Sequence, residues 1–253
     1  GGVSGGGSGG GRWGLRGPVG WPGGRGGAEP TATERANPRR GSGGGRTGRP
    51  PGIPVLAREL DGGLPAGSVV VLKADPASQS ELFLNTFTHV RETVYLTSVR
   101  SADAVVDGID DSAVETGDPV VEAVYHEDPI EETRDNLGAL PDNGTLILDS
   151  AEPLEDAAPE RYRPLLADIG ERVEEAEATA VIHALKGGGA RSRNRLATEQ
   201  VADVVFDLRT RVTSTAIENR LAVTKFRGGA ALEEPVKLTL TDTVSVDTSR
   251  DIA

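Results

Sequence analysis

The hydrophobic positions of the chain fall into two kinds of segment from Gly52 onward. Short, nearly continuous apolar runs are typical of parallel strands buried on both faces of a sheet. These runs predict strands at Val69–Leu72, Thr93–Ser98, Pro119–Tyr125, Thr145–Leu148 and Thr179–Leu185. Segments with helical spacing lie between them and predict helices at Val55–Leu60, from Ser80 onward, and at Ala102–Val106, Ile130–Leu140, Pro159–Ala178 and Leu196–Val201. Strands that alternate with helices indicate an α/β protein with a parallel sheet covered on both faces.

The pattern changes at Val204, where apolar and polar residues begin to alternate. Such alternation is typical of strands with one exposed face. It predicts further strands at Val204–Leu208, Arg211–Ile217, Arg220–Phe226, Val236–Thr241 and Val244–Val246. The predicted fold class is therefore α/β, with a mostly parallel central sheet flanked by helices and a C-terminal antiparallel β meander.

Residues 1–51 differ in composition from the rest, so we expect a Gly/Arg-rich disordered leader followed by a single domain at residues 52–253. The first 50 residues hold 20 of the 34 glycines and both tryptophans. Three interpretations are open: an arm that binds nucleic acid, an inert flexible leader, or a segment outside the natural coding sequence. The absence of an initial Met and the GC-rich codons of Gly, Arg, Pro and Ala favour the last two.

The strongly negative net charge of the domain favours a cytoplasm with a high salt concentration. The first 50 residues carry a net charge of +6, which leaves −18 for the rest of a chain whose total is −12. Such a charge destabilises a compact state at low salt, and molar salt screens it by shortening the Debye length to about 3 Å. We expect a halophilic cytoplasmic protein; an ordinary acidic protein is the alternative. No run of 18 apolar residues suggests a membrane span, and the absence of Cys excludes disulfides and thiolate metal sites.

The segment from Ser68 to Phe87 has the strand–loop–helix layout in which many proteins bind phosphate. A phosphate loop needs glycines for close backbone approach, followed by Lys and Ser/Thr for phosphate and Mg²⁺. The loop Lys73–Gln79 offers Ala74, Ala77 and Gln79 in place of glycines, with Ser78 between the last two. Ser80 and Glu81 follow in place of Lys and Ser/Thr, and the Glu81 carboxylate repels phosphate.

Ligands of parallel α/β sheets bind at the carboxyl ends of the strands. We therefore expect the loops after Leu72, Ser98 and Leu148 to surround one crevice.

The segments GIPVLARELDGGLPAGSVVVL, YLTSVRS, GTLILDS, VADVVFDL and RLAVTKFRGG resemble the RecA/KaiC superfamily, especially the archaeal KaiC-like and GvpD-like proteins. The resemblance covers residues 52–253, and the ending VSVDTSRDIA is similar to haloarchaeal KaiC-like proteins of the HTR-like type. It implies a RecA-like P-loop fold, use of ATP and assembly into rings or filaments.

Position by position, the resemblance implies losses at two separate places. The family's phosphate-loop glycines correspond to Ala74, Ala77 and Gln79, and its Lys and Thr correspond to Ser80 and Glu81. The catalytic Glu pair after the second strand corresponds to Val99 and Arg100, neither of which can activate water.

Four residues match what the family retains. Asp149 corresponds to the Walker B carboxylate that holds Mg²⁺, and Ser150 follows it. Lys225 and Arg227 correspond to the basic pair that reaches a neighbour's γ-phosphate in KaiC-like rings. Each also has a structural interpretation: Asp149 could cap a turn, and the basic pair could be solvated or engaged in ion pairs.

The histidines and the remaining basic cluster give little evidence of a site. His89, His126 and His183 are far apart in sequence, and we do not expect them to form a metal site. Arg191, Arg193 and Arg195 lie in a predicted mobile loop, Gly187–Arg195, where they could meet nucleic acid or balance acidic neighbours. The second interpretation fits the net charge better.

The sequence thus predicts a catalytically degenerate RecA/KaiC-like protein, a pseudo-ATPase that acts as a regulator or scaffold through binding. No cofactor and no catalytic residue are expected, and a homo-oligomer or another protein is the expected partner rather than nucleic acid or a membrane. One alternative is a working ATPase that binds ATP and Mg²⁺ through a non-standard loop. A second alternative is a DNA-associated recombination accessory protein.

The net charge of −18 leads to a prediction about salt. We expect the fold to require about molar KCl, because self-repulsion is screened only there. Far-UV circular dichroism during dialysis into low salt should show cooperative unfolding. A cooperative fold retained at about 50 mM salt would contradict the halophilic interpretation.

Overall fold

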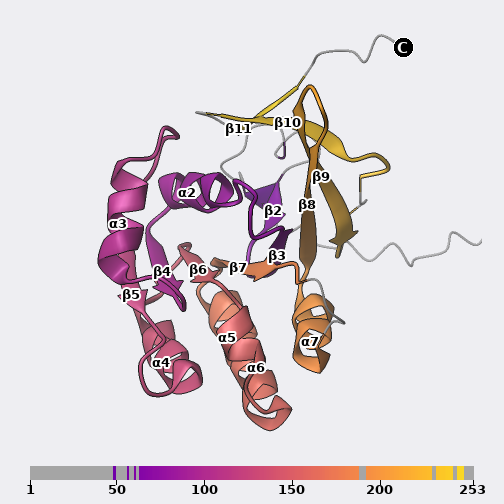
Figure 1. Ribbon diagram of the computed structural model, residues 1–253. Coiled ribbons are helices and arrows are strands. Elements are labelled where there is room, and N and C mark those ends of the chain that lie inside the picture. The colour runs from indigo at the N-terminus through magenta and orange to yellow at the C-terminus, as the bar shows by residue number, and fades with distance from the viewer. Residues whose placement is uncertain are drawn as a thin grey trace, which may run out of the picture. The chain divides into compact units, whose positions relative to one another are not determined.

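Figure 1 shows the computed structural model, which describes residues 48–49, 56, 60, 63–187, 192–229, 232–241 and 244–247. The predicted leader lies outside the described residues, except for strand β1 (Gly48–Arg49), which pairs with β2 (Leu64–Pro65). Of the helix predicted at Val55–Leu60, the structure describes Leu56 and Leu60. Both are buried, and the Leu60 amide donates to the Leu56 carbonyl at 2.9 Å.

The main sheet has nine strands in the order β11-β10-β9-β8-β3-β7-β6-β4-β5. Their bounds are β3 Ser68–Ala74, β4 Thr93–Thr97, β5 Val120–Ala123, β6 Thr145–Asp149, β7 Thr179–Leu185, β8 Val204–Val212, β9 Ile217–Phe226, β10 Val236–Leu240 and β11 Val244–Val246. The strands from β8 to β5 in this order pair in parallel, whereas β8, β9, β10 and β11 pair as an antiparallel meander. The predicted architecture is confirmed.

Helices cover both faces of the parallel part (Figure 1). On one side lie α2 (Glu81–Val90) and α3 (Ala102–Asp110). On the other lie α4 (Pro129–Asn136), α5 (Glu152–Glu155), α6 (Pro159–Glu175) and α7 (Arg193–Val201). Successive residues of β3 divide between the two cores: Val69 and Val71 pack with α4–α7, and Val70 and Leu72 pack with α2 and α3. This explains why the segment Val69–Leu72 is apolar at every position.

Two predicted boundaries are wrong near the C-terminus. The run Arg211–Ile217 is not one strand, because β8 ends at Val212 and β9 begins at Ile217. Thr213 closes the turn between them: its hydroxyl accepts from the Ala216 amide at 3.0 Å, and its own amide donates to the Ala216 carbonyl at 2.8 Å. Side-chain hydrogen bonds of this kind favour turns over strands.

The predicted loop Gly187–Arg195 is also shorter than expected. Helix α7 begins at Arg193, because the Ser192 hydroxyl caps it by accepting from the Arg195 amide at 2.9 Å. Arg193 and Arg195 are therefore helical, and Arg191 lies outside the described residues.

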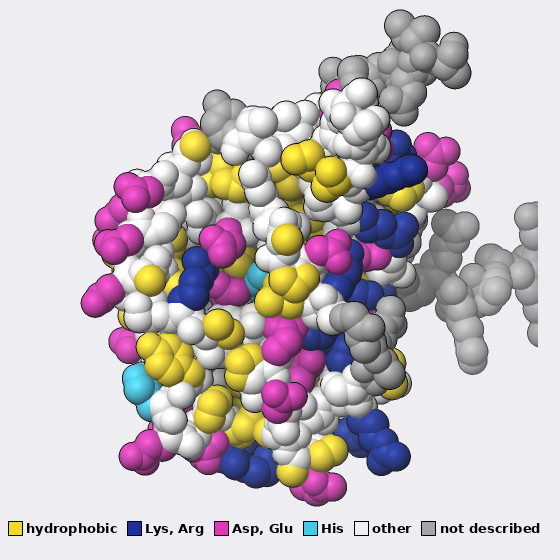
Figure 2. All heavy atoms as spheres, viewed as in Figure 1, with side chains coloured by type: hydrophobic (Ala, Val, Ile, Leu, Met, Phe, Trp, Pro, Cys, Tyr) yellow, Lys and Arg dark blue, Asp and Glu magenta, His cyan; other side chains and the backbone are white. Residues whose placement is uncertain are grey.

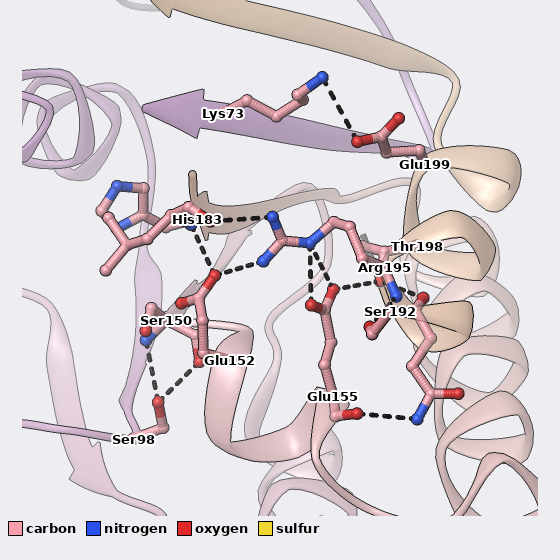
Figure 3. A network of polar contacts seen from close by, with 12 residues as sticks. Lys73, Ser98, Ser150, Glu152, Glu155, His183, Ser192, Arg195, Thr198 and Glu199 are labelled. Carbon is pink, nitrogen blue, oxygen red and sulfur yellow. Dashed lines mark hydrogen bonds and ion pairs between the residues drawn. The ribbon is translucent and has the colours of Figure 1, made fainter. Parts of the chain in front are cut away.

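Arg195 is buried in an ion-pair network that fastens α5 to α7 (Figure 3). Its Nε donates to both carboxylate oxygens of Glu155 at 2.8 and 2.9 Å, and its Nη2 pairs with Glu152. Its Nη1 also donates to the Leu185 carbonyl at the end of β7, at 2.9 Å. The Thr198 hydroxyl completes the network by donating to Glu155 at 2.7 Å. Arg195 thus balances acidic neighbours, as one of the two interpretations of the basic residues predicted.

This burial predicts different effects for two arginines of the same helix. Arg195→Ala leaves the Glu155 carboxylate buried without its cation, and we expect the free energy of unfolding to fall by about 3–5 kcal/mol. The matched control is Arg193→Ala, because Arg193 is exposed at the start of α7 and should change stability by less than about 0.5 kcal/mol. Urea unfolding followed by circular dichroism measures both. Equal effects of the two variants would show that the network does not hold α7.

Candidate functional site

Asp149 lies at the carboxyl end of β6 and is 8% exposed. Strands β4 and β7 lie on either side of β6, and the register places Asp149 opposite Thr97 of β4 and His183 of β7. Each of these two strands supplies one hydrogen-bond partner of the Asp149 carboxylate. The Tyr95 hydroxyl donates to Oδ2 of Asp149 at 2.7 Å, and Nδ1 of His183 lies 2.7 Å from Oδ1. Asp149 follows Ile147 by two residues and therefore faces the α2 side of the sheet.

Arg100 supplies the cation of this site. Its Nη2 donates to Oδ2 of Asp149 at 2.9 Å, and its Nη1 lies 3.2 Å from the Glu81 carboxylate in the first turn of α2. The Thr97 hydroxyl positions it by donating to the Arg100 carbonyl at 3.0 Å and accepting from the Arg100 amide at 3.2 Å. One guanidinium therefore joins the end of β6 to the start of α2.

These contacts determine the protonation of Asp149. Burial by itself raises the pKa of its carboxyl group, but the His183 hydrogen bond and charge, the Tyr95 hydroxyl and the Arg100 charge outweigh burial and lower the pKa to about 2. The group is therefore a carboxylate at neutral pH and can only accept hydrogen bonds. It follows that His183 donates from Nδ1, which leaves its buried Nε2 without a hydrogen-bond partner among the described residues.

Ser98 and Ser150 join the ends of β4 and β6 next to Asp149 (Figure 3). The Ser98 hydroxyl donates to the Ser150 carbonyl at 2.6 Å and accepts from the Ser150 amide at 2.9 Å. The Ser98 amide also donates to the Asp149 carbonyl at 2.8 Å. Ser150 thus serves the backbone, and its hydroxyl group, which is buried, has no hydrogen-bond partner among the described residues.

The loop between β3 and α2 is closed by its own hydrogen bonds. The carbonyl of Asp75 accepts from the Ser78 amide at 2.9 Å and from the Ser78 hydroxyl at 2.6 Å. Ala74 belongs to β3 and is buried. Ala77 and Gln79 complete the loop, and Ser80 precedes α2 without a side-chain capping bond. The amide and hydroxyl of Ser78 are thus used within the loop, whereas a phosphate loop directs such donors at the anion.

Lys225 and Arg227 lie elsewhere. Lys225 pairs in register with Val205 near the start of β8. It therefore lies at the end of the sheet where the parallel strands begin, whereas Asp149 lies at the end where they finish. Its Nζ donates to the carbonyls of Glu199 and Gln200 at 3.0 and 2.8 Å, and Arg227 lies 3.1 Å from Asp203. Burial and the adjacent Arg227 lower the pKa of Lys225. Within one chain, the pair therefore stabilises the C-terminal end of α7.

The three histidines each have a separate acidic neighbour. His89 lies 3.5 Å from Glu115, and His126 lies 3.2 Å from Glu132. His183 contacts Asp149, as described above. The described residues contain no group of three or more His, Cys, Asp or Glu side chains that could hold a metal ion.

Of the predicted site residues, the structure brings Glu81 and Asp149 together through Arg100. Val99 is 66% exposed. Sequence reasoning missed Tyr95 and His183, which are the polar side chains that interrupt two apolar strand segments, VYLT and AVIHAL. A polar residue in a buried strand needs a partner, so this interruption was the available signal.

Two cavities open at the same edge of the sheet, and Asp149 lines neither. One has a volume of about 590 Å³ and lies at the ends of β3 and β7 and beside the middle of β8, where Lys73, Lys186 and Asp207 line it. The other, of about 390 Å³, lies between the loop residues Ala77–Gln79 and the meander.

Comparison with known proteins gives a family. A model of the family of unknown function DUF7125 matches residues 49–253. The chain belongs to this family. No match was found among curated proteins.

A solved structure shows the fold. The KaiC-like protein PH0186 from the hyperthermophilic archaeon Pyrococcus horikoshii OT3 superposes with a TM-score of 0.60 at 15% sequence identity, covering 79% of this chain and 98% of that chain. At this identity the similarity concerns the fold alone, and it confirms the predicted RecA-like architecture. No helix among the described residues is long and apolar enough to cross a membrane.

The low pKa of Asp149 leads to a prediction about acid. A folded pKa of about 2, against an ordinary 3.8, stabilises the fold fully above about pH 4. This stabilisation is lost as the pH falls toward 2 and amounts to about 2 kcal/mol. We expect Asp149→Asn to lose about 2 kcal/mol less than the unmodified chain between pH 5 and 2. Urea unfolding across this range measures the difference, and parallel curves would contradict it.

Proposed function

We propose that this chain is a RecA/KaiC-fold protein that has lost nucleotide hydrolysis and acts by binding, as a regulator or scaffold. The observation that carries the proposal is the position of Arg100, which lies 2.9 Å from the Asp149 carboxylate and 3.2 Å from that of Glu81. A side chain of the protein itself supplies the positive charge that a metal ion supplies in phosphoryl-transfer sites.

Mg²⁺ does not fit this arrangement. The ion would have to bind Asp149 within a few ångströms of a guanidinium that stays protonated at all ordinary pH values. Both oxygens of Asp149 already accept hydrogen bonds, from His183 on one side and from Tyr95 and Arg100 on the other. Mg²⁺ demands near-ideal octahedral geometry and usually relies on substrate phosphates to complete it.

The loop fits a triphosphate equally poorly. Ser80 brings no charge where a lysine would meet the β- and γ-phosphates, and the Glu81 carboxylate adds repulsion. Arg100 lies 3.2 Å from the Glu81 carboxylate and offsets part of this repulsion. Val99 and Arg100 offer no base to activate water. The missing phosphate-binding residues and the missing base therefore both favour a protein that does not hydrolyse ATP.

A protein that hydrolyses no nucleotide can still act through what its surface binds. We infer that the chain works through a protein partner or through copies of itself in a salt-rich archaeal cytoplasm. Its acidic, lysine-poor composition and the KaiC-like fold support this assignment.

The proposal predicts that Mg-ATP does not bind. In molar KCl, millimolar Mg-ATP should leave the melting temperature unchanged, whereas a ligand at 100 times its Kd would stabilise the fold by about 2.7 kcal/mol. No phosphate should be released above background. The double change Ser80→Lys with Glu81→Thr removes the repulsion and adds the missing cation, so we expect weak binding but no turnover.

Asp149→Ala provides the decisive comparison. Saturable Mg-ATP binding by the unmodified chain that is abolished by Asp149→Ala would replace the proposal with the alternative, an ATPase with a non-standard loop. Binding that survives Asp149→Ala would place the nucleotide elsewhere on the chain.

A further inference from the structure

The distal half of β8 has a strand neighbour on one side only among the described residues. β8 pairs with β9 along its whole length, as far as Val212 opposite Ile217. Its pairing with β3 stops at Lys73 opposite Asp207, so Leu208–Val212 extends beyond the parallel sheet. An edge of this kind presents unpaired N–H and C=O groups and can accept another strand.

The direction of the open backbone groups follows from Lys186. Its Nζ reaches past the end of β3 and donates to the Leu208 carbonyl, which therefore faces the open edge. Backbone groups of alternate strand residues point to the same edge. The N–H and C=O groups of Thr210 and Val212 consequently face this edge too, and no hydrogen bond from either residue to a strand on that side is present in the described part of the chain.

One face of the β8–β9 ribbon is basic. Register places Arg209 opposite Arg220, and Arg211 opposite Glu218, around a hollow of about 270 Å³. Like charges directly opposite each other are destabilising. Asp207 compensates Arg209 at 2.9 Å, whereas Arg211 forms no ion pair among the described residues, and the Glu218 opposite it lies 3.9 Å from Arg220. Figure 2 shows a group of Lys and Arg side chains on the side where β8 and β9 lie in Figure 1.

The opposite face of the ribbon carries two exposed aliphatic side chains among polar ones. Val212 and Ile217 are 74% and 68% exposed, although they are large aliphatic side chains on an acidic protein. Together with Thr210 and the loop residues Ala77–Gln79 they line the cavity of about 390 Å³. A strand added along β8 would therefore direct alternate side chains toward arginines on one face and toward aliphatic groups on the other.

We propose that the open edge of β8 at Thr210–Val212 binds an extended segment of another protein in which acidic and apolar residues alternate. The acidic side chains meet Arg209 and Arg211, and the apolar ones enter the cavity of about 390 Å³ beside Val212. The inference is independent of whether the Asp149 site binds nucleotide.

Nucleic acid is a poorer occupant of this surface. Stacking on aromatic side chains contributes much of the affinity for single strands, and no aromatic residue lines the cavities on either face of the ribbon. The net charge of −18 on the domain also repels a polyphosphate backbone. A short acidic segment brings few charges, and its backbone forms the hydrogen bonds that the edge offers.

The first test uses a fluorescent peptide of alternating Glu and Val, followed by anisotropy at the lowest KCl concentration that keeps the chain folded. We expect saturable binding of this peptide and none of its Lys–Val counterpart. Arg211→Glu should weaken binding by about tenfold or more. Arg163→Glu is the matched control, with the same charge change at an exposed site on α6, and should have little effect. Equal loss in both variants, or no binding of the Glu–Val peptide, would overturn the proposal.

A second pair of variants tests the backbone contact. Thr210→Pro removes an N–H that faces the open edge, a position where proline is tolerated, and should abolish binding. Thr210→Val removes the hydroxyl that donates to Asn219 but keeps the N–H, so binding should persist. Hydrogen exchange of the unmodified chain should show new protection in residues 208–212 on adding the peptide. Peptide binding without that protection, or tighter Arg211-dependent binding of an oligothymidylate strand, would contradict an added acidic strand.

Discussion

The charge of Asp149 is the constraint on which the carboxyl edge of the sheet depends. A carboxylate that is almost fully buried must be compensated by hydrogen bonds and by a cation. Tyr95 comes from β4, His183 from β7 and Arg100 from the turn after β4. Compensation of one charge therefore requires polar side chains at the carboxyl ends of three adjacent strands, β4, β6 and β7. Arg100 extends the same constraint to α2 through Glu81. A cation that belongs to the chain cannot dissociate, so the Asp149 carboxylate is compensated without any bound ion.

The layered fold could be predicted because its sequence signals are local. Val69–Leu72 is apolar at every position, and this is how a strand with helices on both faces must read. The helices predicted at Ala102–Val106 and Pro159–Ala178 have local signals too: the Ser101 hydroxyl accepts from the Ala104 amide at the start of α3, and Leu165, Ile169 and Val173 form a buried stripe on α6. The wrong strand prediction at Arg211–Ile217 lies where β8 extends past the end of β3, since beyond Asp207 no second strand requires the side chains to be apolar.

The site was harder to predict because its parts are adjacent only through strand order. Asp149 was identified by its place at a strand end, but its partners lie 54, 49 and 34 residues away along the chain. Only the order β7-β6-β4 brings them together, and strand order is not encoded in any one segment. The contact of Lys225 with α7 was hard to predict for the same reason. A long cation reaches whichever carbonyl groups the tertiary structure places beside it.

The central position of β3 has a consequence for synthesis of the chain. Its two neighbours, β7 and β8, follow it by roughly 100 residues or more. At 5–20 residues per second, a ribosome needs about 5–20 s to supply the first of them. Throughout that interval the apolar segment SVVVLKA has left or is leaving the exit tunnel with both edges unpaired. The strand that is best protected in the finished protein is thus the one exposed longest during translation, and it is where incomplete chains would associate.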